Sequence, residues 1–197
     1  MYQVDKKFPH FSFEVYMPEK ADIGRLTLTE LAGTWVVLLF YPADFTFVCP
    51  TELADIQRLY PEFKKLKAEV LVVSTDTVYT HKAWLEVEEL LKGVEYPMAA
   101  DHNGKFSRAL GIYDEENGMA QRATFIVDPD GVLRAVDIVA DQIGRSAGET
   151  LRKLKALHFV RTHPGNVCPA SWDEGEATIQ PSIKKAGRVY KEYRLSR

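Results

Sequence analysis

Hydrophobic residues recur with two different periods along this chain of 197 residues, and these periods predict alternating strands and helices. Residues 35–40 and 69–74 are almost wholly apolar, which is typical of strands buried on both faces. Between them, from residue 49 to about residue 67, apolar side chains recur every three or four positions, as on a helix with one buried face. A strand, a helix and a second strand in this order predict a parallel pair of strands.

The remaining hydrophobic runs predict further elements around this pair. They are an early edge strand or hairpin at 11–17, a turn at 29–33, a helix at 80–91 with Trp84, Val87, Leu90 and Leu91 as its apolar stripe, a short strand at 97–100, one or two helical turns at 105–110 and a final helix at 145–161. Two β-rich runs, 122–127 and 132–139, flank a Pro-Asp-Gly turn and predict an antiparallel hairpin. We therefore expect an α/β protein with a central mixed β-sheet flanked by helices on both faces.

The chain changes character after the last predicted helix. Pro164, Gly165 and Pro169 lie close together there, and they favour turns over regular structure. We expect residues 1–163 to form one domain and residues 164–197 to form a C-terminal arm that could be mobile.

Composition narrows the classes of function. A net charge of −3 argues against a broad electrostatic footprint for nucleic acid or for an anionic membrane. The chain has no run of about 18 apolar residues, so no membrane span is expected. Residues 1–7 are polar and no apolar segment follows them, so no export signal is expected either. These features predict a cytoplasmic protein.

The chain has two cysteines, Cys49 and Cys168, which lie far apart in the sequence. Structural disulfides are rare in cytosolic proteins, so a transient redox role is the favoured interpretation. Cys49 opens a predicted helix, since Pro50 suits a first helical position and the Glu52 carboxylate suits the N-terminal end of the helix dipole. A helix N-terminus favours thiolate over thiol. The alternative is that Cys49 is only a small buried hydrophobic residue.

Two neighbours give Cys49 the character of a reactive group. Thr46 lies three residues earlier, where its hydroxyl can approach the sulfur, and Pro42 supplies a rigid apolar wall. The pattern Pro42-x-x-x-Thr46-x-x-Cys49, together with the rest of residues 40–53, closely resembles the active-site signature of typical 2-Cys peroxiredoxins of the alkyl hydroperoxide reductase C type. The resemblance extends over about residues 11–185, and it implies a thioredoxin-like fold.

The resemblance also assigns roles to three charged residues. Arg122, in the run Arg-Ala-Thr-Phe, is similar to the family residue that places a guanidinium beside the reactive sulfur. Glu52 and Arg145 match family positions that orient this guanidinium. Without the resemblance, all three would be interpreted as ordinary surface charges.

The segment around Cys168 has two interpretations. Residues 163–172 are similar to the family segment that carries a resolving cysteine and reaches the other subunit of a dimer. The alternative is a metal site formed by His163, Cys168 and Cys49, but such a site lacks a fourth ligand and any short paired spacing.

The activity that the resemblance implies is that of a thiol-dependent peroxidase. Cys49 attacks hydrogen peroxide or an alkyl hydroperoxide and becomes a sulfenic acid, and Cys168 of a second subunit then condenses with it to a disulfide. A dithiol protein, either a flavoprotein disulfide reductase or a thioredoxin-type protein, reduces that disulfide. No cofactor and no metal are expected. A ring-forming holdase chaperone and a redox-relay sensor remain alternatives, whereas a disulfide oxidoreductase is disfavoured because the chain has no Cys-x-x-Cys.

The resemblance further predicts an assembly. The turn at residues 78–81 resembles the contact between dimers in the family, and Phe45 and Trp84 suit packing near it. A homodimer that assembles into a decamer is therefore expected.

A last expectation is resistance to over-oxidation. Sensitive relatives carry a Gly-Gly-Leu-Gly insertion and a C-terminal Tyr-Phe pair, and both are absent here. The extra residues 188–197 contain Tyr190 and Tyr193, which could form a helix face that covers the active-site turn in an unrelated way.

Overall fold

The computed structural model describes residues 3–189, and the chain divides into two compact units, residues 1–147 and 148–197. Within the described residues, every helix is too short or too polar to span a bilayer.

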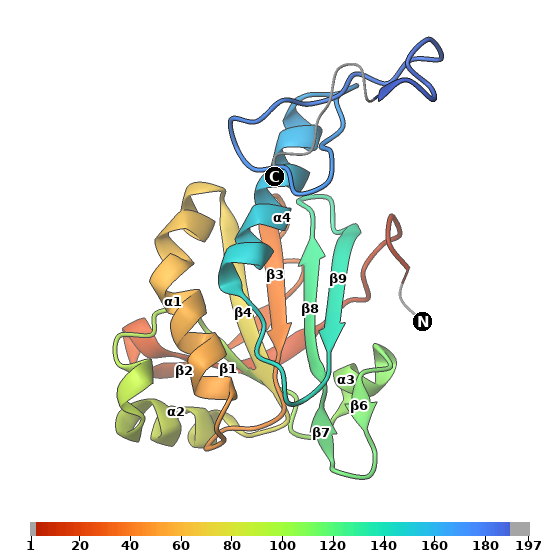
Figure 1. The fold of residues 1–197 in the computed structure, drawn as a ribbon. Coiled ribbons are helices and arrows are strands. Elements are labelled where there is room, and N and C mark those ends of the chain that lie inside the picture. The colour runs from red at the N-terminus through yellow and green to blue at the C-terminus, as the bar shows by residue number, and fades with distance from the viewer. Residues whose placement is uncertain (1–2, 190–197) are drawn as a thin grey trace. The chain divides into compact units, whose positions relative to one another are not determined.

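The first unit is built on a seven-stranded sheet with the strand order β2-β1-β5-β4-β3-β8-β9 (Figure 1). Its strands are β1 Ser12–Met17, β2 Asp22–Thr27, β3 Trp35–Phe40, β4 Ala68–Ser74, β5 Met98–Ala100, β8 Arg122–Val127 and β9 Leu133–Val139. β4 pairs in parallel with both β3 and β5, whereas the other neighbouring strands pair antiparallel. The predicted mixed sheet and the predicted β8–β9 hairpin are confirmed. The early run forms the β1–β2 hairpin, in which β2 is the edge strand; a 3-10 turn, Pro18–Lys20, joins the two strands.

β3 lies inside the sheet, and all six of its residues are buried. Successive side chains of a strand point to opposite faces. Val36, Leu38 and Phe40 therefore share one face, where they belong to an apolar cluster that also packs against Phe106 of the short helix α3 (Lys105–Ala109). Helix α1 (Cys49–Lys65) contacts β4 and covers the other face (Figure 1). The expected helices on both faces are thus present.

The predicted helix over residues 80–91 is wrong in its last four residues. Helix α2 spans Val78–Val87, and a separate 3-10 turn follows at Glu89–Leu91. Glu88 between them has an extended backbone (φ −85°, ψ 111°), which breaks the helical phase. Trp84 and Leu91 are buried as predicted, but the side chains of Val87 and Leu90 are exposed.

A second, two-stranded sheet was not predicted. Strands β6 (Tyr113–Asp114) and β7 (Met119–Ala120) are too short to leave a periodic pattern in the sequence. Their turn is closed by the Asp114 carboxylate, which accepts hydrogen bonds from the backbone and side chain of Asn117.

Helix α4 (Ala147–Thr162) starts two residues later than predicted. The residues after it belong to the same compact unit, where Trp172 is buried and where Val167 and Ile179 form an antiparallel bridge. The expected division into a domain of residues 1–163 and a C-terminal arm of residues 164–197 stays a prediction. Tyr190 and Tyr193 lie outside the described residues.

Candidate active site

The site lies at the segment that connects β3 to α1 and at the first turn of α1. Cys49 is the first residue of α1, and its side chain is fully buried. Pro50 follows it in the first turn, as predicted. The backbone N–H groups of Thr51 and Glu52 both donate to the carbonyl oxygen of Val48, the N-cap residue, and these hydrogen bonds form the first turn of the helix. The unpaired N–H groups of a helix N-terminus favour negative charge at this position.

Arg122 reaches the sulfur from the neighbouring strand. β8 pairs with β3 so that Ala123 lies opposite Phe40, which places Arg122 at the same edge of the sheet as the residues that lead to Cys49. Its Nη1 lies 3.3 Å from Cys49 Sγ and 2.9 Å from Glu52 Oε2. Its Nε donates to the backbone carbonyl of Asp141 at 2.7 Å. The guanidinium is therefore held on two sides and presents one nitrogen to the sulfur.

Glu52 lies one helical turn after Cys49 and joins two arginines. Besides Arg122, it accepts hydrogen bonds from Arg145 through the backbone N–H at 2.7 Å, Nε at 2.8 Å and Nη2 at 3.0 Å. Arg145 Nη1 also donates to Thr124 Oγ1 at 3.1 Å. All of these side chains are buried or nearly so, which makes the network rigid.

The charges in this network stabilise one another. Burial by itself raises the pKa of Glu52, but the hydrogen bonds and charge of Arg145 and the charge of Arg122 outweigh it, so the pKa lies below its ordinary value. Burial by itself lowers the pKa of Arg122, and the hydrogen bond and charge of Cys49, together with Glu52, raise it above its ordinary value. A guanidinium in this setting keeps its charge and stabilises negative charge on the sulfur.

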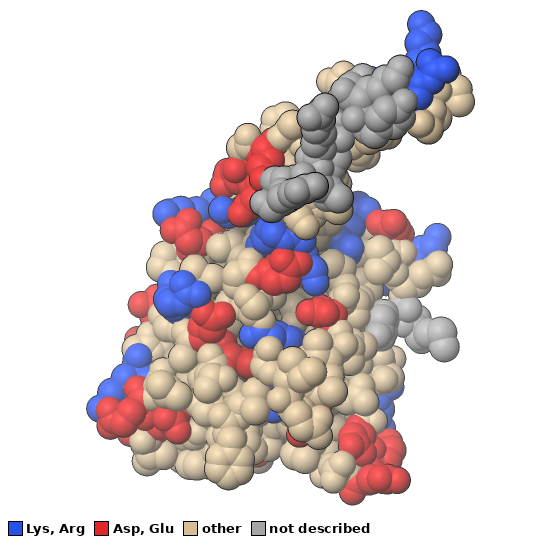
Figure 2. Space-filling model, in the orientation of Figure 1, with Lys and Arg blue, Asp and Glu red and all other residues tan. Residues whose placement is uncertain are grey.

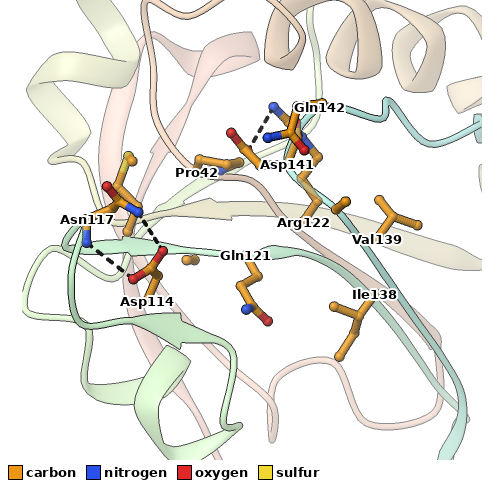
Figure 3. Close-up of a pocket in the computed structure, with 12 residues that line it drawn as sticks. Pro42, Asp114, Asn117, Gln121, Arg122, Ile138, Val139, Asp141 and Gln142 are labelled. Atoms are coloured by element: carbon orange, nitrogen blue, oxygen red, sulfur yellow. Dashed lines mark hydrogen bonds and ion pairs between the residues drawn. The ribbon is translucent and has the colours of Figure 1, made fainter.

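Pro42 and Thr46 lie in the turn that precedes Cys49. Pro42 is buried, and with Arg122 it lines a pocket of about 610 Å³ (Figure 3). The other lining residues are Asp114, Asn117, Met119, Ala120, Gln121, Ile138, Val139, Ala140, Asp141 and Gln142. The Thr46 hydroxyl donates to the carbonyl oxygen of Ala43 at 2.9 Å, which leaves its lone pairs as acceptors.

A second buried network fastens the same turn to the sheet and to α2. The Asp44 carboxylate accepts from the Tyr41 hydroxyl at 2.6 Å and lies 2.7 Å from Nδ1 of His81, whose Nε2 lies 3.1 Å from the Ala99 carbonyl oxygen. The backbone N–H of Asp44 donates to Asp76 at 2.8 Å. The turn is thus attached to its neighbours through both the side chain and the backbone of Asp44.

The structure brings most of the predicted site residues together. Cys49, Arg122, Glu52 and Arg145 form one connected cluster, and Pro42 lines the pocket beside it. Cys168 belongs to the other compact unit, where its thiol is partly buried. The structure thus leaves the roles of Thr46 and Cys168 as predictions.

Several members of the site are not predicted from the sequence. Thr124 stands in the same run as Arg122, and Asp44 stands two residues before Thr46, so their positions in the motifs were the available signals. Asp141 left no signal, because it acts partly through its backbone carbonyl, which every residue type possesses.

The active-site turn exposes two aromatic side chains. Figure 2 shows acidic and basic side chains interspersed on the face viewed, with charged groups at both lower corners and uncharged residues between them. Phe45 and Phe47, which flank Thr46, are 56% and 94% exposed. Exposed aromatic side chains of this kind are typical of protein contacts.

Comparisons with known proteins agree with this geometry. Residues 4–136 match the AhpC/TSA family, and residues 156–193 match the C-terminal domain of 1-Cys peroxiredoxin. Alkyl hydroperoxide reductase C of Staphylococcus epidermidis is 44% identical over 186 residues, which cover 94% of this chain and 98% of the relative. The protein of the same name from Amphibacillus xylanus is 49% identical over 168 residues, which cover 85% and 89% of the two chains.

Solved structures show the same similarity. The crystal structure of Enterococcus faecalis AhpC has a TM-score of 0.81 at 43% identity and covers 86% of this chain and 100% of its own. The reduced 2-Cys peroxiredoxin of Plasmodium vivax has a TM-score of 0.89 at 29% identity, with 96% and 98% covered. The protein is thus a peroxiredoxin, a thiol-dependent peroxidase on a thioredoxin-like fold. Within that class, the chain belongs to the AhpC/TSA family.

Proposed function

We propose that Cys49 is the peroxidatic cysteine and that its substrates are hydrogen peroxide and alkyl hydroperoxides. The observation that carries this assignment is the 3.3 Å contact between Arg122 Nη1 and the buried Cys49 sulfur. The names of the relatives support an alkyl hydroperoxide as substrate.

In the first step, the Cys49 thiolate attacks the terminal oxygen of the hydroperoxide. The sulfur–oxygen bond forms as the O–O bond breaks, and the departing oxygen takes the bonding electron pair and a proton from solvent to leave as water or an alcohol. Cys49 is left as a sulfenic acid. Making a thiol more acidic also weakens the thiolate as a nucleophile, so the larger part of the acceleration must come from positioning and electrostatics.

The residues around Cys49 supply that positioning. Arg122 contacts the sulfur and also lines the pocket, so its charge can stabilise the O–O bond as it breaks. The Thr46 lone pairs can accept the proton-bearing end of the hydroperoxide, since its own proton is given to Ala43. Pro42 supplies an apolar wall of the pocket. Glu52 and Arg145 hold Arg122 in place and do not touch the substrate.

In the second step, Cys168 of a second subunit condenses with the Cys49 sulfenic acid. The Cys168 sulfur attacks the Cys49 sulfur, the S–O bond breaks, and the oxygen leaves as water with the thiol proton. A dithiol protein, either a flavoprotein disulfide reductase or a thioredoxin-type protein, restores both thiols by disulfide exchange. The cytoplasm, where thiols are kept reduced, suits this cycle.

We propose that the subunits form dimers that assemble into a decamer through the active-site turn and α2. Phe45 packs near Trp84 with a ring separation of 6.2 Å, and both Phe45 and Tyr79 are exposed on this side. An exposed aromatic cluster held by a rigid network suits contact with a second dimer.

Single-turnover kinetics tests the assignment of both cysteines. Without reductant, Cys168→Ser should consume one peroxide per chain and form no disulfide, whereas Cys49→Ser should consume none. Peroxide loss that survives in Cys49→Ser would overturn the proposal. Protection of a client protein from aggregation by Cys49→Ser, without peroxidase activity in the unmutated chain, would favour a holdase chaperone instead.

A further inference from the structure

The segment that carries Cys168 is docked on one face of α4. Cys168 Sγ lies 3.9 Å from the Ala156 carbonyl oxygen. The ring of Trp172 packs on Phe159 with a centroid separation of 5.0 Å. Arg152 Nη1 donates to the Trp172 carbonyl oxygen at 2.8 Å. Residues 152, 156 and 159 share one helix face, so the contacts form a continuous strip along α4.

The docked segment is closed on itself. Val167 and Ile179 exchange backbone hydrogen bonds at 2.9 Å and 3.0 Å, so residues 167–179, here called the clasp loop, have their ends joined. Trp172 is only 1% exposed, and its ring nitrogen donates to the Glu176 carbonyl at 3.0 Å. The mobility that turn-forming residues suggested is therefore opposed by specific contacts, and Cys168 is held against its own helix.

Arg152 links the clasp loop to α4 through a hydrogen bond to the backbone of Trp172. Its Nε and Nη2 donate to the two oxygens of Glu149, one turn earlier on α4, at 2.7 Å and 2.8 Å. This fork fixes the guanidinium on the helix, and the remaining terminal nitrogen binds the Trp172 carbonyl. The guanidinium also acts on Cys168: burial raises the pKa of this thiol, and the Arg152 charge opposes part of that rise.

We propose that Arg152 is a positioning residue of the resolving step, which holds the clasp loop closed and so limits how often Cys168 is free to attack the Cys49 sulfenic acid of another chain. The inference rests on the proposed pairing of the two cysteines. The bonds that change in that step are those given above, and no further oxidant or reductant takes part. A slower release gives a second peroxide more time to convert the sulfenic acid to sulfinic acid.

Two substitutions separate the effect of the Arg152 hydrogen bonds from the effect of its positive charge. Arg152→Met removes both, whereas Arg152→Lys keeps the charge but offers one nitrogen, which cannot fork Glu149 and reach the Trp172 carbonyl together. The matched control is Lys153→Met, because Lys153 also pairs with Glu149, at 3.8 Å.

Hydrogen exchange of the reduced protein measures the opening of the clasp loop. The reporters are the backbone amides of Val167 and Ile179, which are bonded to each other's carbonyls. We expect Arg152→Met to exchange about tenfold faster, as the loss of one hydrogen bond from a charged donor would allow, and Arg152→Lys to lie between it and the parent. Lys153→Met should exchange as the parent does.

Mass spectrometry during turnover then gives the functional readout, which a merely structural role would not move. The peroxide concentration at which half of Cys49 becomes sulfinic acid should rise in both Arg152 variants and stay unchanged in Lys153→Met. The proposal would be overturned if hydrogen exchange were unchanged in Arg152→Met, or if Lys153→Met exchanged as fast as Arg152→Met. It would also be overturned if both Arg152 variants exchanged faster but needed the same peroxide concentration as the parent to convert half of Cys49 to sulfinic acid. The absence of a Cys49–Cys168 disulfide in the unmutated protein would instead refute the proposed function itself.

Discussion

The Glu52 carboxylate is the residue on which the charged site depends. It accepts hydrogen bonds from both Arg122 and Arg145 in a site where all three side chains are at most 3% exposed. A buried charge that loses its partner is costly, because neither water nor another group replaces the lost interaction. Glu52 therefore matters for the stability of the fold as well as for the orientation of Arg122.

Glu52→Gln should destabilise the protein by about 3 kcal/mol, since two buried guanidinium groups lose their counter-charge. Chemical denaturation measures this change. Burial raises the pKa of Glu52 in the folded protein, but the hydrogen bonds and charge of Arg145 and the charge of Arg122 hold it below its ordinary value. Its contribution is therefore complete above the unfolded pKa and is lost as the pH falls through the folded pKa. The difference between wild type and Glu52→Gln should accordingly narrow as the pH is lowered below about 4.3.

Glu62→Gln is the matched control for this measurement. Glu62 pairs with Lys65 on the exposed side of α1 at 2.6 Å. Exposed pairs contribute little, so the control should change the free energy of unfolding by less than about 0.5 kcal/mol. A stability difference for Glu52→Gln that stays constant down to pH 3 would contradict the role given to its charge.

Thr46 provides a second test at the scale of single residues. Thr46→Val removes the hydroxyl and should lower the second-order rate constant for peroxide by roughly tenfold to a hundredfold, whereas Thr46→Ser should keep most of it. Stopped-flow mixing with peroxide measures the constant. Equal rates in Thr46→Val and wild type would show that the hydroxyl does not contact the substrate.

At the scale of elements, the active-site turn is fixed by neighbours on several sides. Asp44 is bonded to Tyr41, His81 and Asp76, and Phe45 adopts a positive φ of 56° that side chains rarely take. Gly144 approaches the turn from the loop after β9: a Cβ placed there would lie 3.2 Å from a methyl group of Val48.

Gly144→Ala should therefore push on Val48, the residue just before Cys49, and slow the reaction with peroxide several-fold. The cost in stability should remain within about 1–3 kcal/mol, as for other overpacked sites. Adding Val48→Ala should restore the space and most of the rate. Peroxide kinetics on both variants checks this, and a double variant slower than Gly144→Ala alone would argue against the steric explanation.

Helices and strands could be predicted where the burial of side chains follows the local pattern of apolar residues. Residues 35–40 form a continuous apolar run, and from Cys49 onward apolar residues recur every three or four positions. The structure confirms the strand and the helix that these patterns predict. The pattern failed at residues 88–91, where one extended residue, Glu88, changes the phase of the apolar side chains. Arg122 could be placed beside Cys49 only through a family resemblance, because strand pairing between β3 and β8 is a long-range property that no local pattern contains.

At the scale of the whole molecule, the oxidised protein should run as a disulfide-linked dimer on non-reducing gels. The reason is that the proposed partner of Cys49 is Cys168 of a second chain. Cys168→Ser should lose this covalent dimer. A disulfide formed within one chain, detected by peptide mapping, would refute the pairing.

The assembly should respond to the same chemistry. The reduced protein should sediment as a decamer, and oxidation should loosen it, because disulfide formation requires the turn that carries Phe45 to leave its place beside Trp84. Analytical ultracentrifugation at micromolar concentration measures this. Dimers in both redox states would contradict the proposed contact.

The three tryptophans lie in parts of the protein with different tasks. Trp84 packs near Phe45 in the active-site turn, Trp172 packs on Phe159 in the clasp loop, and Trp35 is buried at the start of β3. Indole fluorescence responds to its surroundings, so a variant that lacks Trp172 and a variant that lacks Trp84 would give separate optical signals for the two proposed steps, with the buried Trp35 kept in both as an internal reference. The catalytic cycle of this enzyme could thus be followed in real time with no added dye.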